Sequence, residues 1–403
     1  MLLSLIRSDV QLGMATIVLD GSVCLNREGA CYKYYSALVP RIVGQGHKVV
    51  FTPGPAGVLD ALRGPGVSVL ERFTPKAPSW LPGGNLRRVL SKARLFVEKI
   101  AVSRGVRQNE VKTGTTNEEV FFSFYYNLPP NPKTPTVIIV HDLIDEIFIK
   151  QFDSEQNRIL RAKRLRAVEN ATQIICNSEC TKRDFLKTYP QFADKTVSIY
   201  IGVDFEFYRK RISDAEAKAT LSKLGLNRPY ILHVGGRVNH KNFELLANAY
   251  KQGNFAATRD LVCTGENFIE SEKQFFKDLG IDKTVRHIRF PEEETLRVLY
   301  QHATVFAYPS KYEGFGIPPL EAMASGCPVI AARGGAVSEV SGGGSQLVSP
   351  DDPTEMIQAL REVLDPIKAQ ALRERGKQHV EKFNWNTLAN RVIDVFLKAA
   401  HSR

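Results

Sequence analysis

Short apolar runs alternate with segments of helical periodicity along the first half of the chain. Apolar runs bounded by turn residues are typical of strands, and their alternation with helices is the pattern of βαβ units. The pattern therefore predicts a parallel sheet with helical crossovers. The predicted strands are residues 15–20, 48–52, 120–124, 136–142, 173–178 and 197–202, and the predicted helices are residues 30–44, 154–170 and 180–188.

A polar stretch, "DFEFYRKRISDAEAKATLSKLGLNRP" (204–229), interrupts this alternation and is predicted to connect two domains. The alternation then resumes. The predicted strands are residues 230–236, 260–265, 285–290, 303–310, 327–332 and 345–350, and the predicted helices are residues 242–252, 268–279, 292–301, 318–325, 353–364, 366–382 and 386–400. Open α/β sheets place ligands beyond the carboxyl ends of their strands, so we expect a site in a cleft between two lobes.

Composition is that of a globular protein: 403 residues, 43% hydrophobic and 24% charged. A chain of this length predicts two or three domains. The six cysteines are scattered and lack the spacing of a zinc site, which favours buried thiols in a reducing compartment.

The N-terminal residues 1–13 precede "MATIVLDG", which starts at Met14 and has the pattern of a first core strand. They are too short and too interrupted for a signal peptide or a membrane span, which leaves a leader or a start-site artefact. Since no other window approaches 18 uninterrupted apolar residues, we expect a soluble protein.

The formal charge of +11 favours anionic partners: nucleic acid, acidic membrane or phosphorylated substrates. The excess is concentrated in residues 72–107, where apolar positions at helical spacing alternate with basic ones. This pattern is compatible with a helix on an anionic membrane surface and with the solvated face of a packed helix. The basic residues lack interleaved aromatics and any known binding motif, so we predict no nucleic-acid partner.

The segment "ILHVGGRVNHKNFELL" has the features of an anion site. A predicted strand ends in Gly235 and Gly236, which let the backbone pass close to a ligand. Arg237 and Lys241 follow, where a helix begins. Two cations beside a helix N-terminus suit a diphosphate. The alternative is a strand-to-helix turn with two surface cations.

The segment "YPSKYEGFGIPPLEAMASG" places two glutamates, Glu313 and Glu321, on either side of a glycine turn and a helix that starts with two prolines. Glycine amides and a helix N-terminus attract phosphate, and a carboxylate can accept bonds from two vicinal hydroxyls. The order of these groups suits a nucleotide diphosphate-sugar.

This segment resembles the E-x-x-x-x-x-x-x-E signature of retaining glycosyltransferases of family 4, which have the GT-B fold. Other stretches that resemble the family appear in its order and spacing. They are "VIIVHDL", "NSECTKRDF", "IYIGVD", "VGGRVNHKN" and the terminal "FNWNTLANRVIDVF". The resemblance implies two Rossmann-like, doubly wound α/β domains that face each other across a cleft. We expect an N-terminal acceptor domain over residues 14–205, a C-terminal donor domain over 206–385, and a last helix, 386–403, that returns to the first domain.

The resemblance also implies roles for individual residues. Arg237 and Lys241 would hold the donor diphosphate and stabilise the leaving charge. Glu313 would bind the transferred sugar, Glu321 the ribose hydroxyls, and His141 would point toward the donor sugar. The remaining donor-binding positions implied by the resemblance are Gly235, Gly236, Gly314, Phe315, Gly316 and Ile317.

The family retains anomeric configuration and needs no metal, and the sequence contains no D-x-D triplet. The resemblance therefore implies a retaining, metal-independent hexosyltransferase without a cofactor. Its donor would be a GDP- or UDP-sugar, with mannose from GDP-mannose favoured. The acceptor would be a glycan or lipid-linked glycan, and the location cytoplasmic, with residues 72–107 meeting the inner face of an anionic membrane. The alternatives are a UDP-glucose or UDP-N-acetylglucosamine transferase and a non-catalytic regulator that binds sugar nucleotides.

Two departures from the family pattern affect these expectations. The turn after the first strand is less glycine-rich than usual, although Gly29, next to Arg27, still suits the start of a helix beside the acceptor. In "HIRFPEEETL", Arg289 replaces the usual glycine, and Pro291, which has no N–H, lies where a backbone amide often meets the base. The acceptor pocket and the base preference are the parts of the site that the sequence defines least.

Overall fold

The computed structural model describes residues 14–24, 30–54, 57–70, 119–237 and 239–402. Three expectations fall outside these ranges: the origin of residues 1–13, the acceptor-side residues Arg27 and Gly29, and the basic stretch at 72–107. They stay predictions.

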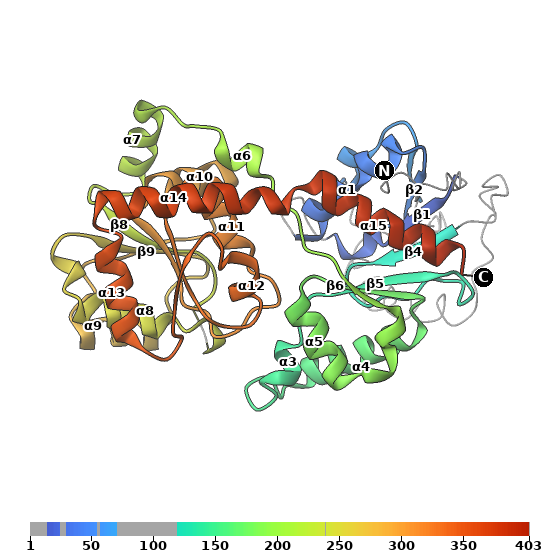
Figure 1. The fold of residues 1–403 in the computed structure, drawn as a ribbon, viewed down its shortest axis with the longest axis horizontal. Coiled ribbons are helices and arrows are strands. Elements are labelled where there is room, and N and C mark those ends of the chain that lie inside the picture. Colours follow the sequence, from blue (N-terminus) through green and yellow to red (C-terminus); the bar gives the residue numbers. More distant parts are fainter. Residues whose placement is uncertain (1–13, 25–29, 55–56, 71–118, 238, 403) are drawn as a thin grey trace, which may run out of the picture. The chain divides into compact units, whose positions relative to one another are not determined.

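The described strands of the N-terminal half form one seven-stranded sheet in the order β3-β2-β1-β4-β5-β6-β7 (Figure 1). They are β1 (Thr16–Leu19), β2 (Lys48–Phe51), β3 (Val67–Val69), β4 (Glu119–Ser123), β5 (Thr136–Val140), β6 (Gln173–Cys176) and β7 (Thr196–Ser198). Strand β1 pairs in parallel with both β2 and β4, so the strand order reverses between β1 and β4. The described α-helices of this half are α1 (Ala30–Gly44), α3 (Ile144–Ile147), α4 (Glu155–Asn170) and α5 (Glu179–Thr188).

The described strands of the C-terminal half form a six-stranded sheet in the order β10-β9-β8-β11-β12-β13, with parallel pairs throughout. They are β8 (Tyr230–His233), β9 (Asp260–Thr264), β10 (Val285–Ile288), β11 (Val305–Tyr308), β12 (Val329–Ala332) and β13 (Gln346–Val348). This is the doubly wound order 3-2-1-4-5-6, and it reverses between β8 and β11.

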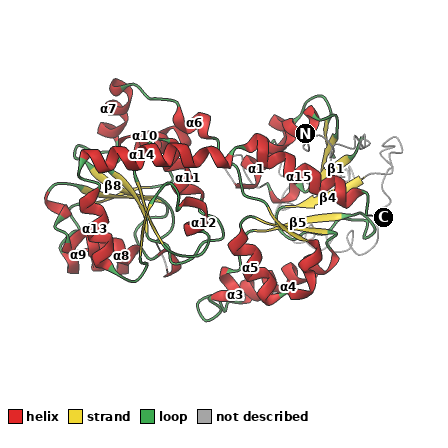
Figure 2. Ribbon diagram, in the orientation of Figure 1, coloured by secondary structure: helices red, strands yellow, loops and turns green. Residues whose placement is uncertain are grey.

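Helices cover both faces of the second sheet, as its buried, apolar strands require. They are α8 (Phe243–Gln252), α9 (Glu270–Leu279), α10 (Glu293–His302), α11 (Ile317–Ala324), α12 (Val337–Ser341), α13 (Pro353–Glu362) and α14 (Pro366–Val380). Figure 2 shows the strands between α8, α9 and α13 on one side and α10, α11 and α14 on the other. Helix α8 illustrates the packing, since Phe243, Leu246 and Tyr250 recur on one side of the helix and are all buried.

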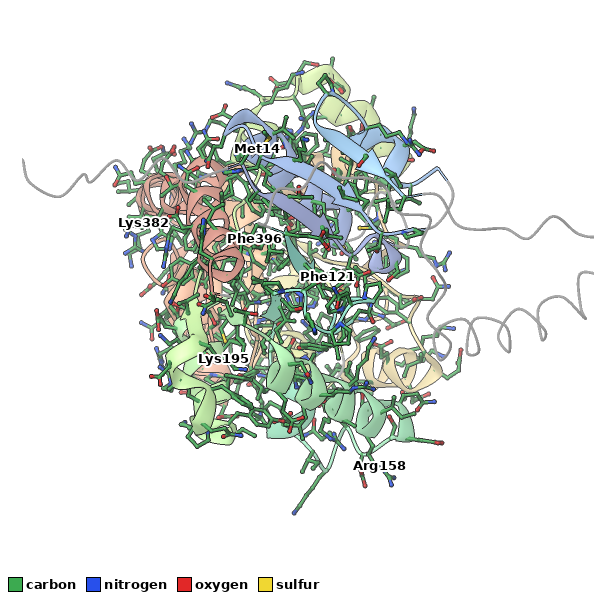
Figure 3. All side chains as sticks on the ribbon, turned by 90° about the vertical axis from the view of Figure 1, so that its right-hand side faces the viewer. Met14, Phe121, Arg158, Lys195, Lys382 and Phe396 are labelled. Atoms are coloured by element: carbon green, nitrogen blue, oxygen red, sulfur yellow. The ribbon has the colours of Figure 1, made fainter. Side chains whose placement is uncertain are left out.

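Aromatic side chains form the core around β1 and β4. Tyr34 of α1 stacks on Phe122 of β4 with ring centroids 6.0 Å apart, and Phe396 lies 5.1 Å from the same ring. Phe396 belongs to the last helix, α15 (Trp385–Ala400), and lies in the interior with Phe121 (Figure 3). Burying a side chain of this size stabilises the fold by about 2 kcal/mol.

The chain divides into two compact units. The first holds the described residues up to 138, with 166–173 and the chain from 393 onward, and the second holds residues 139–165 and 174–392. Strand β5 contributes to both. The predicted boundary between 205 and 206 stays a prediction. Within the described ranges, no helix is long and apolar enough to cross a membrane.

The predicted connector contains two helices, α6 (Phe205–Arg209) and α7 (Asp214–Lys223). Each begins at a capping side chain: the backbone N–H of Phe207 donates to the carboxylate of Asp204, and that of Glu216 donates to the hydroxyl of Ser213. The apolar face of α7 is too narrow to give a clear periodic signal. Strand β3 and helices α3 and α12 are also absent from the sequence prediction. No residue of β3 is fully buried, and the two helices span four and five residues, too few for a helical period to show.

Candidate functional site

The predicted anion-binding residues lie where the order of the second sheet reverses. Arg237 and Lys241 follow β8, and Glu313 follows the neighbouring strand β11. In doubly wound sheets, the crevice at this position is the usual ligand site. The structure thus brings together two sequence motifs whose charged residues, Lys241 and Glu313, are separated by 72 positions in the chain.

Lys241 and Glu313 form an ion pair. The ammonium Nζ lies 2.7 Å from Oε1 and 2.9 Å from Oε2 of Glu313. The side chains are 25% and 9% exposed, so the carboxylate is buried and the ammonium is only partly so. Burial raises the pKa of the Tyr308 phenol well above its usual value, and the Glu313 carboxylate beside it adds to the shift. The Tyr308 phenol therefore stays protonated beside Glu313.

The loops that carry this pair are tied to each other. Asn242, at φ 54° just before α8, donates from its amide to the carbonyl oxygens of Pro309 (3.1 Å) and Pro350 (2.7 Å). The backbone N–H of Lys311 donates to the carbonyl of His240 (2.7 Å). The side chains of Lys241 and Glu313 therefore project from loops that these hydrogen bonds hold together.

Gly314 makes the closest backbone approach in the site. A Cβ at this position would lie less than 3.0 Å from the carbonyl oxygen of His141, so no other residue fits without a shift. The carbonyl of Gly314 accepts hydrogen bonds from the hydroxyls of Ser178 (2.8 Å) and Thr181 (3.0 Å) at the start of α5. All of these residues belong to the second unit. The predicted residue His141 is thus next to the glycine turn through its backbone.

Asp142 is a further carboxyl group against this turn. A Cβ added to Gly314 would also lie within 3.0 Å of the Cβ of Asp142. The Oδ1 atom of Asp142 accepts a hydrogen bond from the backbone N–H of Ile144 at 3.1 Å. Burial raises the pKa of Asp142, and the nearby Glu313 charge contributes in the same direction. No sequence motif singled out Asp142, although it directly follows His141.

Arg237 is engaged within the protein. Its side chain is 4% exposed and pairs with Glu272 of α9 at 2.8 Å from Nε, while its guanidinium lies 4.8 Å from the centre of the Phe268 ring. Nη2 donates to the carbonyl of Glu266 (2.6 Å), and Nη1 donates to that of Thr264 (3.3 Å). Lys241 is therefore the more accessible of the two predicted cations.

His233, at the end of β8, is fully buried below these cations. Its ring nitrogens lie 3.2 Å from the carbonyl oxygen of Ala307 and 3.1 Å from that of Gly236. Burial lowers the pKa of His233 to about 4, so the ring is neutral at physiological pH and adds no charge to the site.

Glu321 is held by two tyrosines. The phenol of Tyr208 donates to Oε1 at 2.9 Å, and that of Tyr300 donates to Oε2 at 3.0 Å. Burial raises the pKa of both phenols, and the Glu321 charge adds to both shifts, so they remain hydrogen-bond donors. No spacing in the sequence relates Tyr208 to Glu321, because the two are 113 residues apart.

Helix α11 begins at Ile317, directly after its N-cap residue Gly316, which has φ 101°. Pro318 and Pro319 occupy its first turn and have no N–H, so the donors available for an anion are the backbone amides of the turn and of Ile317. The start of α11 therefore offers an anion fewer backbone N–H donors than a helix start without prolines. Gly235, at φ 118°, gives the matching turn after β8.

Among the described residues, no group of three or more His, Cys, Asp and Glu side chains could hold a metal ion.

Comparison with known proteins defines the family. Residues 216–379 match the model of "Glycosyl transferases group 1", and residues 33–207 match that of "Glycosyltransferase Family 4". The chain belongs to this glycosyltransferase family. The two matches together cover both sheets except β1. With the two parallel sheets and the solved structures reported below, the expected GT-B fold is confirmed.

Curated relatives share parts of their length with this chain. It is 29% identical to D-inositol 3-phosphate glycosyltransferase of Corynebacterium kroppenstedtii over 57% of this chain and 54% of the relative. It is 37% identical to MMP alpha-(1->4)-mannosyltransferase of Mycolicibacterium hassiacum over 32% of each chain, and 26% identical to O-antigen chain mannosyltransferase B of Escherichia coli over 57% and 61%. The chain thus matches about a third to three fifths of the length of these relatives.

Solved structures share the fold. Sucrose-phosphate synthase from Thermosynechococcus elongatus superposes with a TM-score of 0.67 at 21% identity, covering 95% of this chain and 98% of that one. Anabaena HepE in complex with UDP and glucose gives a TM-score of 0.63 at 19% identity, covering 95% and 99%.

Proposed function

We propose that this glycosyltransferase is a retaining, metal-independent hexosyltransferase that moves mannose from GDP-mannose to a hydroxyl of a glycan or lipid-linked glycan. The observation that carries the proposal is the Lys241–Glu313 pair at the reversal point of the second sheet. It offers a cation for a diphosphate beside a carboxylate for sugar hydroxyls. The mannosyltransferases among the relatives support the choice of sugar.

The ion pair suggests how the donor would bind. Both oxygens of the Glu313 carboxylate accept hydrogen bonds from Lys241 Nζ. A bound diphosphate would attract the same ammonium, and Glu313 would then accept hydrogen bonds from the sugar. Nη1 of Arg237 donates to the carbonyl of Thr264 at 3.3 Å, and its second hydrogen would donate to a phosphate oxygen. Glu321, positioned by its two tyrosines, would accept hydrogen bonds from the ribose hydroxyls.

For the chemical step we propose displacement on one face of the sugar. The bond from the anomeric carbon to the diphosphate oxygen breaks while the bond to the acceptor oxygen forms on the same side. The acceptor proton passes to a phosphate oxygen of the departing GDP. Lys241 and the amides of the glycine turn stabilise the charge that develops on the diphosphate, and His141 faces the transferred sugar.

A UDP-sugar is the second candidate donor, because the loop after β10 departs from the family pattern. Phe290 has φ 37°, an unusual conformation for an aromatic residue, and is 58% exposed beside Arg289. Pro291 follows and has no N–H for a base. The identity of the base therefore depends on side chains that are particular to this chain.

Thermal stabilisation by GDP, UDP, ADP and their common sugar conjugates, in the presence of a chelator, tests the proposal. We expect GDP and GDP-mannose to raise the melting temperature of the wild type and to raise that of Glu321→Ala much less. A shift with UDP compounds alone would replace GDP-mannose by the second candidate. The absence of any shift would contradict the donor site and favour a non-catalytic role.

A further inference from the structure

The first sheet has its own crevice position, and polar side chains occupy it. Strand order reverses between β1 and β4, whose residues pair from Thr16 and Glu119 onward. Loops that diverge from such a point open a crevice at the carboxyl edge of the sheet. The side chains of Asp20, Ser22, Ser123 and Asn127 interact here, and the backbone N–H of Tyr125 donates to the Ser123 hydroxyl. These five residues, called the Asp20 cluster below, all belong to the first unit.

Asp20 organises the cluster without reaching a ligand itself. The residue is 2% exposed, and its carboxylate is fully engaged. Oδ1 accepts hydrogen bonds from the hydroxyls of Ser22 (2.6 Å) and Thr52 (3.4 Å), and Oδ2 accepts bonds from Ser123 Oγ (3.1 Å) and Asn127 Nδ2 (2.7 Å). A buried carboxylate with this many donors is a fixed point that orients the side chains around it.

Asn127 is turned by Asp20 so that its carbonyl oxygen is available. Its Nδ2 group donates to Asp20 Oδ2 and, at 3.2 Å, to Ser22 Oγ, which uses both amide hydrogens. The amide oxygen has no partner among the described residues, and the side chain is only half-buried. Asn127 therefore presents a hydrogen-bond acceptor of fixed direction beside the exposed Ser22 hydroxyl.

Tyr125 is held outward in the same loop. Ser123 Oγ accepts the backbone N–H groups of Tyr125 (3.3 Å) and Asn127 (3.0 Å), which folds the loop over the end of β4. The residue between them, Tyr126, is buried and has φ 56°. A left-handed conformation costs a non-glycine residue about 1–2 kcal/mol. The loop maintains it and leaves Tyr125 43% exposed, edge-on against Phe124 with centroids 5.0 Å apart.

We propose that the Asp20 cluster binds a neutral, hydroxyl-rich ligand: a hexose ring that packs on Tyr125 and donates a hydroxyl to Asn127 Oδ1. The cluster offers an aromatic face and hydrogen-bond acceptors, and its own atoms carry one negative charge and no positive one. A sugar hydroxyl satisfies these acceptors, whereas a phosphate brings further acceptors and a like charge. That this sugar is the acceptor of transfer rests on the proposed function.

Saturation-transfer NMR with methyl α-D-mannoside, with mannose 6-phosphate as the anionic counterpart, tests this binding without any donor. We expect the wild type to bind the mannoside at least about tenfold more tightly than the phosphate. Tyr125→Ala should lose about tenfold in affinity, corresponding to one lost contact of ~1.4 kcal/mol, and Tyr125→Phe should stay within about twofold of the wild type because it keeps the ring.

Asn127→Ala should weaken the mannoside by a similar factor, and Asn248→Ala, which removes an exposed amide from α8, is the matched control. Because Asn127 also bonds to Asp20, its variant could lose stability. Tyr125→Ala leaves the hydrogen bonds to Asp20 in place and keeps the test valid. Unchanged mannoside binding in Tyr125→Ala, or tighter binding of mannose 6-phosphate by the wild type, would overturn the proposal.

The nucleotide experiment separates this inference from the proposed function. If GDP-mannose stabilises the protein and Tyr125→Ala binds the mannoside as the wild type does, the inference fails and the proposed function stands. If the variants lose mannoside binding but no nucleotide stabilises the protein, the carbohydrate site stands and the proposed function fails.

Discussion

Lys241 and Glu313 each compensate the charge of the other in a partly buried position. Lys241→Met would leave the Glu313 carboxylate buried and unpaired, and we expect it to lower the free energy of unfolding by about 2 kcal/mol. Glu313→Gln should also destabilise. The double variant Lys241→Met/Glu313→Gln should be more stable than the sum of the single effects indicates, while all three lose donor binding. Urea unfolding and nucleotide-induced thermal shifts measure both effects.

The same loop provides a matched control. Lys311 pairs with Asp351 at 2.8 Å, but their side chains are 43% and 73% exposed. Solvent screens such a pair, so the corresponding double-mutant cycle should give a coupling below about 0.5 kcal/mol. A coupling between Lys241 and Glu313 as small as this would contradict the view that the pair is held in a buried site.

The tyrosines around Glu321 lead to a second prediction. Tyr208→Phe removes the donor to Oε1 and keeps the ring, so the carboxylate loses one of its two phenol donors. We expect KM for the nucleotide sugar to rise about tenfold with kcat within about twofold, because ribose binding is the same in the ground and transition states.

Tyr250→Phe is the control for this change, since it removes a phenol of the same domain that donates to the carbonyl of Arg259 (2.7 Å) instead. Its KM should stay near the wild-type value. A fall in kcat with unchanged KM in Tyr208→Phe would show that Glu321 serves the chemical step and not the binding of ribose.

At this scale the sequence defines residue types better than partners. It predicts that Lys241 and Glu313 lie at the same edge of a sheet, since strand ends of a parallel sheet meet there. It does not predict that Arg237 pairs with Glu272, because that contact depends on how α9 begins. Tyr208 lies in the polar stretch that the sequence predicts as a connector, and nothing in its local pattern marks it as a partner of Glu321.

Among the elements, the glycine turn before α11 is the one most constrained by its neighbours. Gly314→Ala would push a Cβ into the His141 carbonyl and displace the loop that carries Glu313. We expect a loss of about 2–4 kcal/mol in the free energy of unfolding and loss of donor binding. Thermal denaturation with and without the preferred nucleotide measures both.

Gly44→Ala provides the comparison for that prediction. Gly44 ends α1, and a Cβ there would meet nothing within 4 Å. The substitution should be neutral or stabilise by up to about 1 kcal/mol, because alanine restricts the unfolded chain. Equal effects of the two substitutions would contradict the role given to the close approach at Gly314.

Helices with a clear period and strands with an apolar run between turn residues are predicted well, and elements that lack such a pattern are not. The predicted helix over 30–44 is α1, and the predicted strands of both sheets are present. Helix α7 was missed because its buried surface is limited to a small cluster around Ile212, Ala217 and Val298. A helix that buries so little has few apolar positions from which a period can be recognised.

For the whole molecule, the net charge of +11 would by itself suggest a protein that binds nucleic acid. We expect stabilisation by the preferred nucleotide to change less than about threefold in apparent affinity between low salt and about 0.5 M NaCl, because partly buried ion pairs are weakly screened. Binding of a single-stranded DNA oligomer, measured in parallel, should disappear over the same range. Retention of DNA binding at high salt would revive a nucleic-acid role.

The two sheets share the strand order 3-2-1-4-5-6, which the first sheet extends by β7. The sequence pattern establishes two successive α/β sheets, but strand order is a property of long-range pairing that local patterns leave undetermined. The order matters because it specifies which loops share a crevice. In each sheet these are the loops after its first and fourth strands, and one candidate site lies at this position in each sheet.

The shared strand order lets the loops that carry each site change in sequence while the sheets stay the same. The loops after β1 and β4 lie outside the strand pairing that holds the first sheet together, so their residues can change while the sheet is inherited intact. Grafting residues 124–127 from a relative that uses another acceptor sugar should therefore transfer part of that relative's acceptor preference. The preference for the donor nucleotide should stay unchanged. Competition assays with paired sugars would show whether the loop is exchangeable in this way.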